Sequence, residues 1–476
     1  MRLLSKSFLV LILFLTIFSG SILVSMPFGL AQSGTNVTGI IAQDTTWTPS
    51  GSPYTLTGNT LVYEGATLTI QPGVTVNLGS YYIEVNGTLS AIGNPANKIT
   101  FNGGQITFTT VSNGWNEQTN SGCLIENAVI QQTSISSVNP TKIDSCVVNG
   151  KITVASSIIT NNVVTGNINS YTAFPEQGQT NAPMDSSVIS SNNVNGEIIL
   201  GYLGLGSVTA PWEACTVSGN TVEGSIISGS PKGTPQIFNN TVTSAPQSVK
   251  GTVSNGEGIG CDGYASIYNN YIYGCQDGIS LYTLRVFGGN LPCYATIQNN
   301  IITGNAQGIS ISLTDVHGGI GQQYCPTILN NTVSGNTIGI SLSGFGYTAA
   351  PIIKYNNLQS SSNYTFYLQE SNNVDLSYNW WGTNDQHAIN QSIYDFKNDF
   401  NLGIVNFVPY LTATNPQTPT TLNTPTPMPT PSTSQTPSSS PNPTSSVPEL
   451  SWLVILPLFI FVLFIAVILK YRKSKV

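Results

Sequence analysis

Short runs of alternating apolar and polar residues, each followed by paired asparagines, occupy the middle of the chain. The clearest copies read x-x-Ile-x-Asn-Asn and lie at residues 235–240, 265–270, 295–300 and 326–331. Their second asparagines recur at intervals of 30, 30 and 31 residues. Weaker copies of the pair occur at Asn162, Asn193, Asn220, Asn357 and Asn379. A repeat of this length is typical of solenoid proteins.

Each repeat predicts short strands, because apolar and polar positions alternate with a period of two. The units are too short for a crossover helix and lack the two-residue turns of hairpins. Coils of about 20 to 31 residues with strands stacked in parallel satisfy both facts, so we expect an all-β solenoid. The second asparagines would form a ladder at one corner, each amide bonded to the next about 4.8 Å away. The ladder residues are Asn240, Asn270, Asn300 and Asn331.

The segments at residues 60–76 and 83–91 look like opening coils of a known fold, and residues 379–410 look like its closing segment. On these segments and the Asn repeat, the chain resembles right-handed parallel β-helix proteins of the pectate-lyase-like superfamily, as exported by archaea and bacteria. We expect N-terminal coils and a cap at 44–110, repeat coils at 156–377 and a closing segment at 378–411. The superfamily contains lyases, hydrolases, adhesins and inert scaffolds, so the fold leaves function open.

The N-terminus has the pattern of a secretory signal. Arg2 and Lys6 precede an apolar run at residues 8–24, and small residues bracket Leu30 as in a signal-peptidase site. This pattern predicts a signal peptide over residues 1–31, with an uncleaved N-terminal anchor as the alternative.

The C-terminus has the pattern of a membrane anchor. An uncharged apolar run at residues 452–469 is followed by a basic tail at 470–476, which predicts a transmembrane helix over 450–469 with a cytoplasmic tail. Residues 412–448 are rich in Pro, Thr and Ser and predict a disordered, extended stalk. We therefore expect a single-pass cell-surface protein with an extracellular β-helix ectodomain at 32–411.

Charge and polarity narrow the range of partners. The chain carries 14 Lys and Arg against 21 Asp and Glu, and much of the positive charge lies at the two ends. An acidic ectodomain disfavours nucleic-acid binding and leaves cations or neutral polymers as partners. Sequons predict a glycoprotein, and they occur at Asn36, Asn86, Asn239, Asn330, Asn363 and Asn390.

Two acidic residues fall in one column of the repeat. Glu257 and Asp277 each precede a Gly-Ile pair, so stacking makes them neighbours one coil apart. Carboxylates roughly 5 Å apart repel unless one is protonated or a cation lies between them. The pair is a candidate for a calcium site or for the two carboxyls of a retaining glycosidase. The alternative is that both side chains project into solvent at a turn.

A second column stacks Arg285 on Asp315 and Phe287 on His317, where both loops exceed the basic coil. These loops predict an aromatic and polar patch suited to polysaccharide, whose rings stack on aromatic side chains. The alternative is an ordinary Arg–Asp salt bridge. The candidate ligand-binding residues are Tyr282, Phe287, Tyr294, Tyr324, Phe345 and Tyr347, and the candidate catalytic residues are Glu257, Asp277, Arg285, Asp315 and His317.

The resemblance implies two catalytic patterns, and the chain departs from both. Lyases of the superfamily use a calcium-bound acidic cluster with a basic Arg, and its polygalacturonases use several aspartates with Gly-His-Gly. Here Arg285 is the one outward arginine of the repeats, and His317 stands in Val-His-Gly-Gly. A copper site, known in some relatives, is disfavoured because the chain has 2 His and 4 Met, which are dispersed.

The chain has 7 cysteines, an odd number that leaves at least one unpaired outside the cell. Cys261, Cys293 and Cys325 recur every 32 residues, so stacking predicts a disulfide bond from Cys293 to Cys261 or to Cys325. No C-x-x-C motif is present, which disfavours zinc.

From these patterns we expect a non-catalytic, membrane-anchored surface protein that binds polysaccharide or envelope glycans. The alternatives are a polysaccharide lyase or glycoside hydrolase of the parallel β-helix type and a purely architectural envelope component. No cofactor other than calcium is indicated.

Overall fold

The computed structural model describes the chain from residue 34 to residue 420, with gaps. The described residues are 34–170, 185–201, 214–229, 233–243, 256–282, 284–286, 289–291, 293–314, 325–345 and 350–420. The predicted signal peptide, the predicted transmembrane helix and most of the predicted stalk lie outside them. Within these ranges, no helix has the length and apolar character needed to span a membrane.

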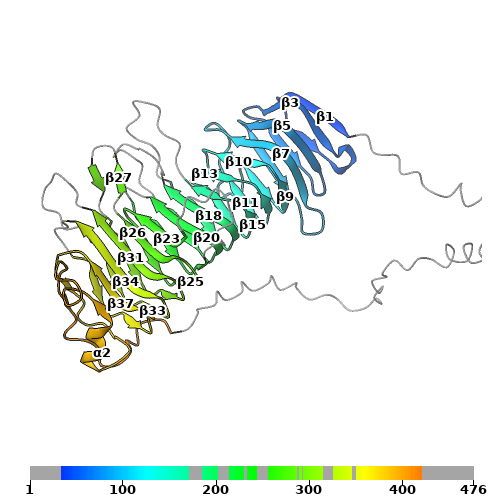
Figure 1. Cartoon of the computed structure of the whole chain (residues 1–476). Coiled ribbons are helices and arrows are strands. Elements are labelled where there is room, and N and C mark those ends of the chain that lie inside the picture. Colours follow the sequence, from blue (N-terminus) through cyan, green and yellow to red (C-terminus); the bar gives the residue numbers. More distant parts are fainter. Residues whose placement is uncertain are drawn as a thin grey trace, which may run out of the picture. The chain divides into compact units, whose positions relative to one another are not determined.

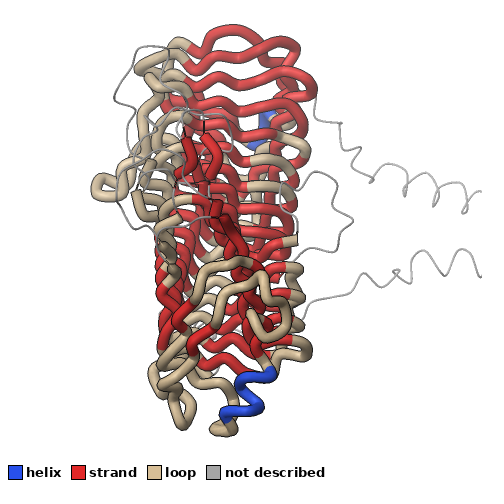
Figure 2. The backbone as a smooth tube through the Cα atoms, turned by 60° about the vertical axis from the view of Figure 1, so that its left-hand side comes forward, coloured by secondary structure: helices blue, strands red, loops and turns tan. Residues whose placement is uncertain are grey.

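Two long parallel sheets wind around one core, as Figures 1 and 2 show. Within the described residues the larger sheet has 23 strands: β1 (Thr35–Ile41), β3 (Tyr54–Val62), β5 (Thr75–Val85), β7 (Ile99–Phe108), β9 (Ala128–Gln131), β10 (Ser134–Ser137), β12 (Val147–Asn149), β13 (Ile152–Val154), β15 (Val163–Thr165), β16 (Ile168–Ser170), β18 (Asn193–Gly201), β20 (Thr221–Gly229), β22 (Thr241–Thr243), β23 (Glu257–Asp262), β25 (Tyr271–Tyr273), β26 (Asp277–Tyr282), β30 (Ile301–Thr303), β31 (Gln307–Thr314), β33 (Thr332–Ser334), β34 (Ile338–Phe345), β36 (Asn357–Gln359), β37 (Tyr364–Gln369) and β39 (Ile393–Tyr394).

The smaller sheet has 13 strands in the same ranges: β2 (Thr45–Trp47), β4 (Thr67–Ile70), β6 (Thr88–Ile92), β8 (Leu124–Glu126), β11 (Lys142–Asp144), β14 (Ile158–Thr160), β17 (Val188–Ser190), β19 (Thr216–Ser218), β21 (Gln236–Phe238), β24 (Ser266–Tyr268), β29 (Thr296–Gln298), β32 (Thr327–Leu329) and β35 (Ile352–Lys354). The remaining elements are the pairs β27 (Leu284–Val286) with β28 (Gly289–Leu291) and β38 (Val374–Asp375) with β40 (Val405–Asn406), the 3-10 helix η1 (Pro49–Gly51) and the helix α2 (Gln386–Gln391). The predicted all-β solenoid of parallel strands is thereby confirmed.

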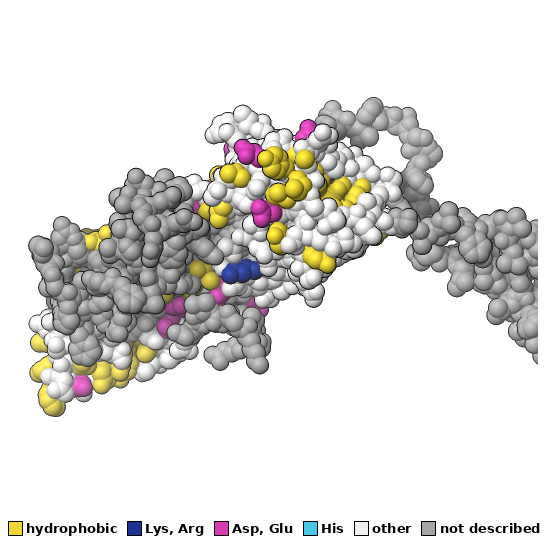
Figure 3. Space-filling model, turned by 90° about the horizontal axis from the view of Figure 1, so that it is seen from above, with side chains coloured by type: hydrophobic (Ala, Val, Ile, Leu, Met, Phe, Trp, Pro, Cys, Tyr) yellow, Lys and Arg dark blue, Asp and Glu magenta, His cyan; other side chains and the backbone are white. Residues whose placement is uncertain are grey.

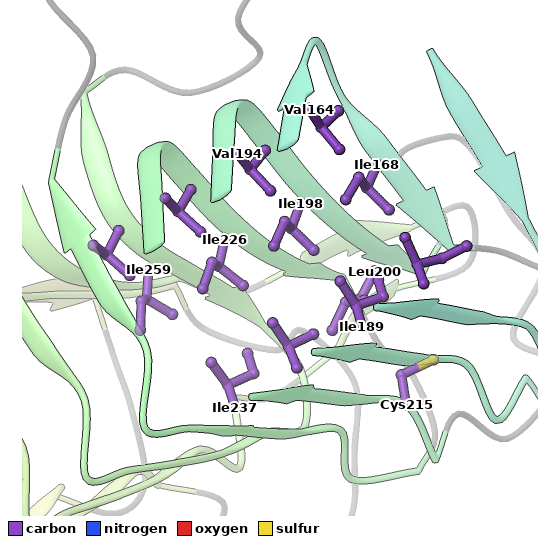
Figure 4. Packing of buried hydrophobic residues seen from close by; sticks show 14 of the residues in the cluster. Val164, Ile168, Ile189, Val194, Ile198, Leu200, Cys215, Ile226, Ile237 and Ile259 are labelled. Atoms are coloured by element: carbon purple, nitrogen blue, oxygen red, sulfur yellow. The ribbon is translucent and has the colours of Figure 1, made fainter. Parts of the chain in front are cut away.

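The core consists of columns of like side chains. The smaller sheet stacks Ile237, Ile267, Ile297 and Ile328 on one another, and all of them are fully buried. Val194, Ile198 and Ile226 of the larger sheet face Ile189 and Ile237 of the smaller sheet across the interior (Figure 4). β-branched side chains suit this arrangement because they pack well on a pleated surface.

A ladder of asparagines runs along one corner of the coils. Asn270 donates from Nδ2 to Asn300 Oδ1 at 3.0 Å and to the Ile237 carbonyl at 2.9 Å. Its own Oδ1 accepts from the backbone N and the Nδ2 of Asn240, both at 3.0 Å. The same pattern joins Asn162, Asn192, Asn220, Asn240, Asn270, Asn300, Asn331, Asn356 and Asn379.

The structure corrects the prediction for the weaker repeats at two positions. The ladder contains Asn192 and Asn356, where the sequence pattern had indicated Asn193 and Asn357. The reason is register. A ladder asparagine stands two residues before a buried apolar residue, as Asn192 stands before Val194, which pairs with Val222 in the core. Asn193 and Asn357 open strands and take the place of the threonines in other coils.

The two asparagines of each pair have separate roles. The first has a left-handed backbone, with φ of 56° at Asn239, 55° at Asn269 and 56° at Asn299. Asn adopts this conformation more readily than most residues, so it turns the corner that the second asparagine then seals with its amide. A second, shorter ladder joins Asn305 to Asn336 at 3.0 Å and was not foreseen from the sequence.

The ordered domain extends beyond the expected boundary at residue 411. Asn415 lies outside the repeats, and it still bonds to them. Its backbone N donates to Asn357 Oδ1 at 2.8 Å and its Nδ2 donates to the Tyr355 carbonyl at 2.6 Å. Thr332 Oγ1 donates to the Pro419 carbonyl at 2.7 Å. Residues 412–420 therefore pack along the last coils, although their composition is that of the stalk.

Replacing Asn270 by Ala tests the ladder. The change leaves the backbone N and the Nδ2 of Asn240 without their acceptor in a buried site, at a cost of about 1–3 kcal/mol for each group. We expect the free energy of unfolding in urea to fall by roughly 2–6 kcal/mol. The control is Asn195→Ala, since Asn195 is exposed and donates one bond of 3.3 Å to Glu223. Equal stability of the two variants would contradict a structural role for the ladder.

Candidate functional site

The outer side of the larger sheet carries an unusual group of side chains on β23 and its neighbours. In β23, Ile259 and Cys261 belong to the core. Gly260 faces the other way, since a Cβ built there would lie 3.0 Å from the Glu257 carboxyl carbon and 3.0 Å from Ile227 Cδ1. Glu257, Gly260 and Ile227 thus share the outer side, and alternation places Asp262 there as well.

Because adjacent strands are parallel and in register, the residues on this side of the sheet line up in rows from one coil to the next. Glu257 lies opposite Asp277, and Asp277 lies opposite Gln307. The sequence-based pairing of the two carboxyls is therefore what the structure has. Asp262 lies opposite Tyr282 in the same ladder of strands. We call Glu197, Glu257, Asp262 and Asp277 the acidic face. Other Asp and Glu side chains are scattered over the side of the molecule that Figure 3 draws.

Burial decides the protonation of Glu257. Removal from water raises the pKa of its carboxyl to about 7, since burial disfavours the charged form. A hydrogen bond with Ser280 opposes this rise, whereas the nearby carboxyls of Asp277 and Glu197 add to it. Burial also raises the pKa of Asp277, against a hydrogen bond with Gln307. Both members of the column therefore favour the protonated form more than an exposed carboxyl does.

Asp262 is the most enclosed member of the acidic face, with 3% of its surface exposed. Burial raises the pKa of this carboxyl to about 8, and Cys293 contributes in the same direction. Its Oδ1 and the Oδ1 of Asp277 are buried without a hydrogen-bond partner in the described structure. The pKa of the Tyr282 phenol is also raised, mainly by burial and further by the nearby carboxyls of Glu257 and Asp262.

The predicted calcium site gains little from this arrangement. Glu257 and Asp277 supply two carboxyls, and in the part of the chain that the structure describes no group of three or more His, Cys, Asp or Glu is arranged to hold a metal ion. Calcium prefers six to eight oxygen ligands. The described ion pairs of Lys142, Lys354 and Lys397 do not include Glu257, Asp262 or Asp277.

The side chains of the second predicted column lie outside the described part of the structure. Arg285 pairs through its backbone with Asn290 in the β27–β28 hairpin, which branches from the coil instead of continuing its parallel sheet. Asp315, His317, Phe287, Tyr324 and Tyr347 lie outside the described residues, as do the side chains of Arg285 and Phe345. The stacking of Arg285 on Asp315 and of Phe287 on His317 stays a prediction.

The two remaining candidate tyrosines occupy different surroundings. Tyr282 lies on the acidic face. Tyr294 is half-buried and stacks on Tyr264 with ring centroids 4.3 Å apart and planes 14° apart, next to the start of β29. The side chains of Phe287, Tyr324, Phe345 and Tyr347 lie outside the described residues, so the aromatic patch stays a prediction.

A row of hydroxyl groups ending in tyrosines was missed from the sequence. Register aligns Ser280 with Ser310, Ser310 with Ser341, Ser341 with Tyr367, and Tyr367 with Tyr394. We call these residues the Ser–Tyr row. Tyr364 flanks its end, with ring centroids 5.7 Å from Tyr367 and 5.2 Å from Tyr394. Aligning Tyr-Thr-Phe-Tyr-Leu with the Gly-Ile-Ser segments would have revealed the row, but the glycine is absent there.

Cys261 and Cys293 are in hydrogen-bonding contact inside the coil. That contact raises the pKa of the Cys261 thiol, and burial raises it further. Burial, together with Cys293, raises the pKa of Cys325 to about 11. No disulfide bond joins any of the cysteines, all of which lie within the described ranges, so the predicted bridge is not formed in this structure. The contact favours Cys261 over Cys325 as the partner of Cys293.

Comparison of the chain with models of known protein families, with curated proteins and with solved structures finds no match. The stacked parallel strands therefore establish a β-helix-like solenoid by themselves. The superfamily inferred from sequence resemblance belongs to the proposal below.

The raised pKa of Glu257 predicts a pH-dependent stability. The folded protein favours the protonated carboxyl, so its contribution is full below about pH 4.5 and is lost as the pH rises through about 7. At about 1.4 kcal/mol per pKa unit this amounts to roughly 3 kcal/mol. We expect Glu257→Gln to gain stability relative to the wild type between pH 5 and pH 8 in urea unfolding. Glu223→Gln, at an exposed carboxyl, should follow the wild type; a parallel course of all three proteins would refute the assignment.

The thiol contact predicts which disulfide bond forms under oxidation. Treatment of the folded protein with oxidised glutathione should join Cys261 to Cys293 by thiol–disulfide exchange, because the two thiols are hydrogen-bonding neighbours. Peptide mass spectrometry after alkylation and non-reducing digestion should find that linkage. A Cys293–Cys325 peptide as the main product would instead support the alternative pairing.

Proposed function

We propose that the protein is a non-catalytic surface β-helix that binds an extended polysaccharide along the Ser–Tyr row. The row carries this proposal, because it combines hydroxyl groups and aromatic rings in one line across successive coils. Sugar rings stack on aromatic side chains while their hydroxyls require polar partners. From Ser280 to Tyr394 the row crosses four strand spacings, about 19 Å at about 4.8 Å each. That length suits several sugar units.

The predicted location agrees with such a ligand. The expected signal peptide at residues 1–31, stalk and membrane helix at 450–469 would present the solenoid outside the cell, where polysaccharides are accessible. The resemblance to the pectate-lyase-like superfamily, which includes adhesins and carbohydrate-active enzymes, points to the same class of ligand.

Hydrolysis or lysis of the polysaccharide is the second candidate, and the Glu257–Asp277 column favours it. Glu257 has a pKa of about 7, as a general acid requires, and a carboxyl lies one coil away. A retaining mechanism also needs an ionised nucleophile beside that acid. Burial raises the pKa of Asp277 as well, so the column does not divide the two roles between its members. We therefore favour binding without cleavage.

A polysaccharide panel separates these candidates. The purified full chain is run in gels containing neutral or acidic polysaccharides, with and without calcium, and new reducing ends are assayed in parallel. We expect retardation without cleavage, and roughly two- to tenfold weaker binding for Tyr367→Ala, since the stacking of one aromatic ring contributes about 0.5–1.5 kcal/mol.

The control is Tyr63→Ala, which removes an exposed tyrosine between β3 and β4 and should leave retardation unchanged. Cleavage that disappears in Asp277→Asn would establish the enzyme instead. Neither retardation nor cleavage with any polymer would count against both candidates.

A further inference from the structure

Two of the sequons occupy the same position in different coils. Asn239 and Asn330 are the first asparagines of their pairs and turn the corner with φ of 56° and 55°. Each is followed by a buried ladder asparagine and then by a threonine, Thr241 or Thr332, and both threonines belong to one row of the larger sheet. The two sites share their sequence pattern, their backbone and their place in the coil, so they differ only in what lies against them.

One of these two sites is covered by the end of the ordered domain. We call residues 412–420 the C-terminal strap. Asn415 of the strap donates from Nδ2 to Asn330 Oδ1 at 2.9 Å, and Thr332 Oγ1 donates to the Pro419 carbonyl at 2.7 Å. The strap therefore engages both side chains that define the sequon at Asn330, and it leaves that asparagine half-buried.

The sequon at Asn239 has no such cover. Asn239 is exposed, and among the described residues neither its side chain nor that of Thr241 forms a hydrogen bond. The corner is also remote from the Ser–Tyr row, since β22 separates it from β23, where Gly260 lies in line with Ser280. A bulky group on Asn239 would thus leave the proposed polysaccharide row accessible.

The remaining sequons divide in the same way. Asn36 is exposed on β1 and its side chain forms no hydrogen bond among the described residues, so this sequon is open. In the other three, the residue that supplies the hydroxyl is engaged or buried: Thr88 accepts from Asn113 at 2.6 Å, Ser392 donates to the Ile389 carbonyl at 2.8 Å, and Thr365 has 6% of its surface exposed.

We propose that Asn36 and Asn239 accept N-linked glycans and that the C-terminal strap keeps Asn330 unmodified. Glycosylation joins the asparagine Nδ2 to the anomeric carbon of an oligosaccharide that is carried on a lipid diphosphate. The bond from that carbon to the diphosphate oxygen breaks, the lipid diphosphate leaves, and the amide loses one proton to the transferase.

At Asn330 this reaction is opposed twice. The bulky glycan would have to displace Asn415, which bonds to the same amide group, and the threonine hydroxyl that the motif requires is bonded to Pro419. The inference goes beyond polysaccharide binding and does not depend on it.

Transfer of a glycan to the folded protein tests the inference. The full chain is produced without glycosylation, purified in detergent and incubated with a single-subunit oligosaccharyltransferase and its lipid-diphosphate-linked oligosaccharide. Glycopeptide mass spectrometry then measures the occupancy of each sequon. We expect Asn36 and Asn239 to be modified and Asn330 to be modified about tenfold less, the factor that about 1.4 kcal/mol of strap bonding provides. Asn415→Ala should raise the occupancy of Asn330 by a similar factor and leave Asn239 unchanged.

Gln417→Ala is the matched control, because Gln417 is an exposed strap residue that bonds to Asn415 Oδ1 through its backbone N at 3.1 Å. This variant should keep Asn330 unmodified. Equal occupancy of Asn330 and Asn239 in the wild type, or no change at Asn330 in Asn415→Ala, would overturn the role of the strap.

Half-buried Asn86 reports on folding in the same samples, since its Oδ1 accepts from Thr109 Oγ1 at 2.6 Å. A rise at Asn86 together with Asn330 in Asn415→Ala would attribute the effect to unfolding and would also overturn the role of the strap. Absence of glycan from Asn36 or Asn239 in the wild type would overturn that residue as an acceptor. Each of these outcomes leaves the proposed polysaccharide binding to its own assay.

Discussion

The alignment of one coil on the next is the constraint on which this structure depends. In a solenoid each coil contacts only its neighbours, so a shift in any coil would displace every later row. The asparagine ladder fixes this alignment, because each buried amide bonds to the next amide and to a core carbonyl. An amide out of step would leave several buried polar groups unsatisfied, whereas a stacked isoleucine out of step loses only part of its contacts.

The same alignment produces the candidate site. Once the ladder sets the register, any residue at one offset from the asparagine joins its counterparts in a row on the outside of the sheet. The Ser–Tyr row arises in this way from Ser280, Ser310 and Ser341, which alternate with buried apolar residues of the core. The proposed binding row thus uses outward positions of the repeat, while the inward positions form the core.

The length of the coils and the pairing of residues between neighbouring coils could be predicted from the sequence, because both repeat along the chain. The spacing of Asn240, Asn270 and Asn300 was sufficient for the fold, and the shared position of Glu257 and Asp277 before a Gly-Ile pair placed them opposite each other. Single features escaped prediction. Asp262 has no counterpart in other coils, and its importance comes from burial, which one sequence does not reveal. The double asparagines at 192–193 and 356–357 were ambiguous until the buried residue two positions later fixed the choice.

Stacking has opposite consequences for neutral and for charged residues. A column of asparagines or tyrosines gains from contact at each step, but a column of carboxylates is penalised at about the same spacing. The chain limits this penalty by following Asp277 with Gln307 and by placing Ser280 next to Glu257. Asp262 and Asp277 still keep a buried oxygen without a donor. The stack tolerates these carboxyls because burial raises the pKa of Glu257, Asp262 and Asp277, which favours their neutral, protonated forms.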